Sequence, residues 1–104
     1  MDVKSYCDTI SNQLIGWKAS IYDIIRAAQR LSDKDRKTVQ PMIDSLNRVM
    51  DDLNRNLNEL KSQCPADWSP QRQDIEGKMG RLKSNFEQIS DELQSLLPDS
   101  TAWV

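Results

Sequence analysis

The sequence predicts an all-α fold, an antiparallel up-down-up three-helix bundle with coiled-coil-like heptad packing, and three observations support this prediction. Apolar residues recur at alternating steps of four and three through three long segments of the 104-residue chain, which is the spacing of a helix that buries one stripe. The stripe changes phase between segments instead of continuing. Residues typical of helix ends stand at each change, so three helices joined by short turns can bury their stripes against one another.

The first predicted helix covers about residues 2–31. A repeat of about 3.5 residues nearly matches the helical turn of about 3.6 residues, so the apolar side chains gather on one side and partner helices must cover them. Asp2 stands where a capping side chain favours the helix N-terminus. The stripe consists of Val3, Cys7, Ile10, Leu14, Trp17, Ile21, Ile24, Ala28 and Leu31.

The second predicted helix covers about residues 33–64. Ser32, followed three residues later by Asp35, resembles a capping box, although Glu or Gln is the preferred second residue. The helix ends before Pro65, because proline disfavours helical geometry in the residue that precedes it. The stripe restarts in a new phase and consists of Val39, Ile43, Leu46, Met50, Leu53, Leu57, Leu60 and Cys64.

Pro41 leaves the start of this second helix open, because proline is tolerated in the first turn of a helix but kinks its interior. We expect the helix to begin near Asp33 and to kink around Pro41; the alternative makes Thr38 the cap after a longer loop. In an antiparallel pair, the numbers of facing residues have a constant sum. The early start predicts a sum close to 67, and the later start would select about 74.

The third predicted helix covers about residues 70–97. It follows Ser69-Pro70, an N-cap hydroxyl with a proline at the first helical position, and Leu97-Pro98 ends it. The bundle domain is therefore predicted to span residues 1–98, with a C-terminal tail at 99–104. The stripe consists of Trp68, Ile75, Met79, Leu82, Phe86, Ile89, Leu93 and Leu96, with Arg72 at one slot.

Composition and charge exclude several classes of function. The net charge is -2, and Lys and Arg are interspersed with Asp and Glu, whereas a nucleic-acid-binding face concentrates basic residues. No apolar run approaches the roughly 20 residues of a membrane span, and no signal-peptide pattern opens the sequence. We therefore expect a soluble cytoplasmic protein that contacts neither nucleic acid nor membrane.

Metal, cofactor and catalytic sites are likewise not expected. The sequence has no histidine, and two cysteines without CxxC spacing cannot close a zinc site. A nucleophile would need an activating group in a pocket, and a narrow bundle has little room for a pocket or a small-molecule ligand. The chain is therefore predicted not to be an enzyme.

Cys7 and Cys64 form the first candidate site. Antiparallel packing brings the start of the first helix and the end of the second to the same end of the core. Two interpretations stay open: a disulfide or redox pair, which would close a long loop and add roughly 4 kcal/mol, or two buried thiols that act as small apolar residues.

Apolar residues beside the main stripes mark a candidate interaction surface. Ile15, Tyr22 and Ile25 form an edge along the first helix. We expect this edge to face the third helix; the alternative is an exposed strip that binds a partner or a second copy. Met42 and Val49 widen the second helix in the same way.

Gly77 and Gly80 complete the candidate surface, although they form no phosphate-binding loop because they lie inside the third helix. Each costs about 1 kcal/mol relative to alanine there. They either allow close approach of another chain or form a tolerated soft turn. The expected function is a non-catalytic helical protein–protein interaction module that binds a protein partner or itself. The alternative is a redox-responsive helical element that uses Cys7 and Cys64.

Overall fold

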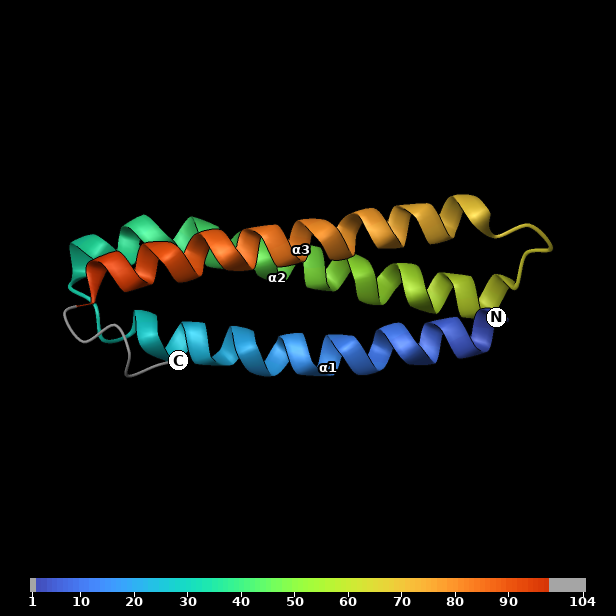
Figure 1. Cartoon of the computed structure of the whole chain (residues 1–104), viewed down its shortest axis with the longest axis horizontal. Helices are drawn as coiled ribbons and strands as arrows, with labels where there is room; N and C mark the ends of the chain where they lie inside the picture. The colour runs from blue at the N-terminus through green and yellow to red at the C-terminus, as the bar shows by residue number, and fades with distance from the viewer. Residues whose placement is uncertain (1, 98–104) are drawn as a thin grey trace.

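The computed structural model describes residues 2–97 and confirms the all-α antiparallel three-helix bundle (Figure 1). α1 covers Val3–Ala28, α2 covers Asp33–Gln63 and α3 covers Ser69–Leu96. The bundle measures 52 × 21 × 17 Å, and the loop that joins α2 to α3 lies at the same end as the start of α1. No strand occurs within residues 2–97.

Side-chain caps start α1 and α2 as the sequence predicts. The Asp2 carboxylate accepts the backbone N–H of Ser5 at 2.7 Å. Ser32 Oγ accepts the backbone N–H of Asp35 at 3.2 Å. Each bond satisfies one of the N–H groups that the first turn of a helix leaves without a partner.

Two helix ends differ from the prediction. Trp68, and not Ser69, is the N-cap residue of α3, and the Asp67 carboxylate accepts the N–H of Ser69 at 3.1 Å. α1 ends at Ala28 because the N–H of Leu31 bonds the Ala28 carbonyl three residues back, which tightens the chain into the turn. Leu31 stays buried although it lies outside the helix.

α2 starts at Asp33 and continues through Pro41, which confirms the earlier of the two predicted starts. Proline has no N–H for the carbonyl four residues back. Because Pro41 and Lys37 are both exposed, water can satisfy that carbonyl. The proline is therefore tolerated at this position inside α2.

The contacts between α1 and α2 fit the predicted register. Asp8 pairs with Lys61 at 3.4 Å, and the Cys7 thiol donates to the Leu57 carbonyl at 3.8 Å. The residue numbers of these pairs add to 69 and 64, close to the predicted 67 and short of 74. The early start of α2 leaves a short turn after α1, and a short turn allows only this register.

The core is one column of apolar side chains, and α2 packs closely on both α1 and α3, whereas α1 and α3 approach each other less closely. Aromatic rings bridge this wider space. Trp17 meets Phe86 edge to face at 5.2 Å between ring centres, and Tyr6 meets Trp68 at 5.1 Å. Rings are larger than aliphatic side chains and so fill the gap. The fully buried side chains include Ile24, Val39, Leu46, Leu53, Leu60, Ile75, Leu82, Ile89 and Leu93.

Candidate functional site

The large exposed hydrophobic residues of the described chain lie on one strip of α1. Ile15 is 68% exposed and Tyr22 is 58% exposed. They are seven residues apart and therefore on the same side of the helix; Ile25, one turn further on, is partly buried against the core. Asp8, seven residues before Ile15, pairs with Lys61 of α2. The strip therefore runs along the α2 side of α1.

The expectation that this edge faces the third helix is wrong. Tyr22 and Ile25 line an open hollow of about 310 Å³ between α1 and α2, together with Asn47 and Asp51 of α2. Sequence alone could not decide this, because the α1 stripe has two flanks and each lies beside a different neighbour. Which neighbour lies beside which flank depends on the hand of the bundle.

We call the outer surface between these two helices the α1–α2 face, and its edges the α1 rim and the α2 rim. Along each rim, successive residues are alternately four and three positions apart, so they lie on one side of their helix. The α1 rim consists of Asp8, Ser11, Ile15, Lys18, Tyr22, Ile25 and Gln29. The α2 rim consists of Gln40, Asp44, Asn47, Asp51, Asn54, Asn58 and Lys61. The middle of the α1 rim is largely apolar, whereas the α2 rim is polar throughout.

The two residues expected to widen the second helix offer less surface. Val49 is buried, and Met42 is partly buried and packs against the core. Neither lies on the α2 rim. Both therefore extend the core sideways and add little to an interaction surface.

Gly77 and Gly80 are exposed on α3, and a Cβ atom at either position would meet nothing within 4 Å. No contact within residues 2–97 therefore requires glycine at these positions. Close approach of another chain stays a prediction.

Replacing both glycines with alanine is expected to raise the free energy of unfolding by about 1 kcal/mol per site, because alanine loses less backbone entropy on forming a helix. Urea denaturation of the double variant measures the gain. Gly16→Ala in α1, where the added Cβ is equally free, is the matched control. A double variant less stable than the native chain would contradict this reasoning.

The two cysteines lie in different environments, and both are free thiols. Cys7 is fully buried, and its Sγ donates to the Leu57 carbonyl. Cys64 is exposed at the C-cap of α2, where its backbone is left-handed with φ 43°, and its Sγ lies 2.9 Å from the Lys61 carbonyl. The buried-thiol interpretation therefore describes Cys7 and not Cys64, and their pairing stays a prediction.

Burial raises the pKa of the Cys7 thiol above its ordinary value, which keeps the thiol protonated and unreactive. With a thiol reagent near pH 8, we expect Cys7 to react at least roughly tenfold more slowly than Cys64, because it reacts only when the bundle opens. Quenching the reaction at timed intervals, followed by mass spectrometry of the peptides, measures both rates. The Cys64→Ser variant leaves only the reaction of Cys7. Equal rates would show that Cys7 is as accessible as Cys64 and would support the redox interpretation.

Stability is expected to fall in alkali because burial raises the pKa of both Tyr6 and Cys7 above their ordinary values of 10.0 and 9.0. The unfolded chain loses these protons at the ordinary values, while the folded chain holds them to higher pH. Stability is therefore unaffected below about pH 9 and falls as the pH rises through the folded pKa values. Tm measured across this range tests the prediction; Tyr6→Phe should show a smaller fall, and an equal fall would exclude the phenol as a source.

Arg72 fills the polar slot in the α3 stripe, and its contacts explain why. The guanidinium carbon lies 5.5 Å from the ring centre of Tyr6 and 5.9 Å from that of Trp68, and Nε pairs with Glu76 at 3.1 Å. A guanidinium over aromatic faces is held by cation–π attraction. Arg72 thus closes one end of the core. In the sequence, the spacing of four residues between Trp68 and Arg72 could have indicated this contact, because residues four apart lie on the same side of a helix.

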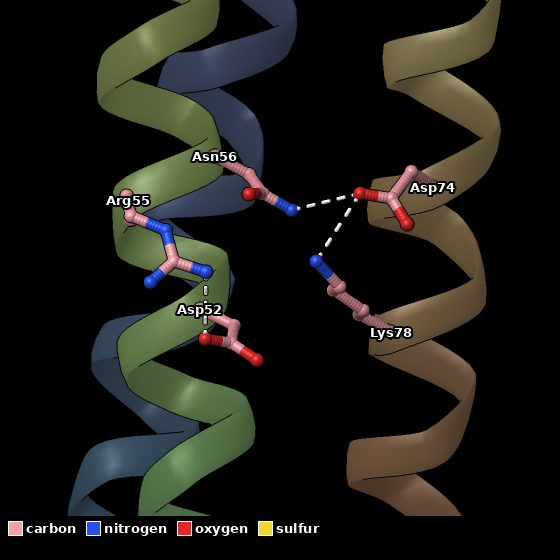
Figure 2. Close-up of polar contacts among 5 residues, drawn as sticks. All are labelled: Asp52, Arg55, Asn56, Asp74 and Lys78. Atoms are coloured by element: carbon pink, nitrogen blue, oxygen red, sulfur yellow. Dashed lines mark hydrogen bonds and ion pairs between the residues drawn. The ribbon is translucent and has the colours of Figure 1, made fainter.

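A polar bridge links α2 to α3 (Figure 2). The Asn56 amide donates to the Asp74 carboxylate at 2.9 Å, and the Lys78 ammonium lies 3.2 Å from the same oxygen. Arg55 pairs instead with Asp52 of its own helix at 2.9 Å. All five side chains are at least partly exposed, and such contacts add little stability. The bridge therefore links α2 and α3 at their surface and adds little to the stability of the bundle.

Within residues 2–97, no group of three or more acidic or cysteine side chains could hold a metal ion. None of the three helices has an apolar stretch long enough to cross a lipid bilayer. Comparison of the chain with models of known families, with curated proteins and with solved structures found no match. The α1–α2 face is therefore interpreted from its own geometry.

Proposed function

We propose that the chain is a non-catalytic helical protein–protein interaction module that binds its partner through the α1–α2 face. The observation that carries the proposal is the exposure of Ile15 and Tyr22 on one strip of α1. Removing apolar surface from water drives association, at roughly 25 cal/mol per Å². A single exposed apolar residue needs no explanation, but two on one strip of α1, with Tyr22 at the edge of an open hollow, mark a candidate contact surface.

The shape of the face favours a helical partner. The face between two packed helices runs along the bundle, and helices of a partner laid along it would set apolar residues on the α1 rim and polar residues on the α2 rim. The Asn amides of the α2 rim both donate and accept hydrogen bonds, so they suit polar residues of a partner.

The remaining parts of the proposal rest on the sequence pattern. We propose coiled-coil-like heptad packing among the three helices and a cytoplasmic location. Enzymatic activity, a cofactor, a small-molecule ligand, nucleic acid and membrane contact have no part in the proposed function.

Site-specific photo-crosslinking tests the proposal. The chain carries p-benzoylphenylalanine at Tyr22 on the α1–α2 face or at Ser84, an exposed residue of α3, and is irradiated in its native host. We expect discrete adducts at Tyr22, either with a second copy or with another protein, that are absent or much weaker at Ser84. No adduct at Tyr22 beyond those at Ser84 would overturn the proposal.

The redox-responsive alternative gains no support from the placement of the thiols. A redox pair needs two accessible sulfurs, at least one with a lowered pKa. Cys7 is fully buried, and burial raises the pKa of its thiol. The interaction module is therefore the better supported function.

A further inference from the structure

We infer that the partner of the α1–α2 face is a second copy of this chain, with α1 of one copy lying antiparallel on α1 of the other. The inference rests on the proposed function, because it names the partner of the same face. It follows from three features of the face: the order of residues along the α1 rim, the charges along the α2 rim and the total area.

The middle of the α1 rim has the same spacing in both directions. Its residues from Ser11 to Gln29 follow steps of four, three, four, three and four, which are symmetric about residue 20. An antiparallel pairing centred there places Ile15 of one copy opposite Ile25 of the other. The same pairing places Lys18 opposite Tyr22, twice. Apolar residues thus meet apolar ones, and each ammonium meets an aromatic ring, a favourable cation–π arrangement.

The middle of the α2 rim, from Asp44 to Asn54, is complementary to itself in the same arrangement. Asp8 pairs with Lys61, and midway along the face Lys18 and Tyr22 line the same hollow as Asp51 and Asn47. These pairs all have residue numbers that add to 69, so residue 20 of α1 lies about level with residue 49 of α2. The two-fold axis that stacks α1 on α1 therefore stacks α2 on α2 about residue 49. This places Asp51 opposite Asn47 and Asp44 opposite Asn54 of the second copy. Each carboxylate meets an amide that can donate to it, and no two like charges face each other in these pairs.

The other symmetric arrangement of two such faces is less favourable. A two-fold axis parallel to the helices would set the α1 rim of one copy on the α2 rim of the other. Ile15 and Tyr22 would then cover Asn54 and Asn47, whose amides lose water without gaining hydrogen bonds. The same arrangement would set Lys18 on Asp51, but an exposed ion pair contributes little. The antiparallel arrangement of α1 on α1 avoids this loss.

The face is large enough for a dimer. A long face of a bundle that measures 52 Å by 21 Å covers on the order of 1,000 Å², more than the roughly 800 Å² per partner of a standard stable interface. Symmetric dimers with one two-fold axis are the commonest assemblies of soluble proteins.

Sedimentation equilibrium of the full chain measures the association. We expect a monomer–dimer equilibrium with a dissociation constant below about 1 mM. Ile15→Lys and Tyr22→Lys should each weaken it by at least tenfold, and Ser84→Lys on α3 should leave it unchanged. Ile15 and Tyr22 are exposed, so these variants keep the fold, which circular dichroism checks. A chain that stays monomeric up to about 1 mM, or a dimer insensitive to both rim variants, overturns the inference.

Cysteine crosslinking tests the orientation. In a Cys64→Ser background, chains with Ile15→Cys are mixed with chains with Ile25→Cys and oxidised gently. We expect mixed dimers to form in excess over either homodimer, because the proposed pairing sets these positions opposite each other. Two copies of position 15 would be offset by about 15 Å along the helix, too far for a disulfide. Homodimers of Ile15→Cys in equal yield overturn the antiparallel pairing.

The two proposals can fail separately. A monomeric chain that still forms adducts at Tyr22 with a different protein overturns the self-association and leaves the interaction module standing. A monomeric chain without specific adducts overturns both.

Discussion

Leu53→Ala is expected to lower the free energy of unfolding by roughly 2–5 kcal/mol, which is a large share of the total stability of a small domain. Leu53 is fully buried near the middle of α2, the helix that packs closely on both of its neighbours. Truncation there removes apolar surface from the core and leaves a cavity that three stiff helices cannot close.

Urea denaturation with a constant m-value measures the loss. Ile15→Ala is the matched control, because it also removes most of an aliphatic side chain but from a position that is 68% exposed. Its effect should stay within about 0.5 kcal/mol. If the two variants lost the same stability, the assignment of α2 to the centre of the core would be wrong.

Trp17→Ala is expected to lower the free energy of unfolding by roughly 3 kcal/mol, the low end of the range for large aromatic residues, because Trp17 is partly exposed. Its ring fills the wider space between α1 and α3 and meets Phe86 edge to face. Removing it leaves the less closely packed pair of helices without its central contact.

A double-mutant cycle with Phe86→Ala separates the ring contact from simple burial. We expect a coupling energy of about 0.5–1.5 kcal/mol between the two positions. Trp17→Phe should retain part of this coupling, since a smaller ring still reaches across the gap. Strictly additive losses would show that the two rings do not stabilise each other.

The helices were predictable because their signals are local. The caps at Asp2 and Ser32 formed as predicted, and the stripe spacing correctly predicted the side of each helix that is buried. The misplaced ends have local causes as well. Asp67 accepts the N–H of Ser69, so the chain turns one residue earlier than Ser69-Pro70 alone indicated, and α1 tightens into its turn before Leu31.

The candidate site was less predictable because it depends on neighbours in space. Spacing identified Ile15, Tyr22 and Ile25 as a group, and that group does lie on one strip. The helix that lies beside the strip was predicted wrongly. Val49 flanks the stripe of the second helix and is nevertheless buried, whereas Cys64 is the last residue of that stripe and is nevertheless exposed, because burial at the edge and end of a stripe depends on which neighbours cover it.

The number of helices, the places where the chain turns and the buried stripe of each helix follow from local sequence, since they depend on the spacing of apolar residues and on caps a few positions apart. The hand of the bundle, in contrast, is visible only when the three helices are seen packed together. Two arrangements of opposite hand bury the same stripes but exchange the neighbours at the flanks. That choice placed Ile15 and Tyr22 beside the polar rim of α2, and it thereby created the α1–α2 face.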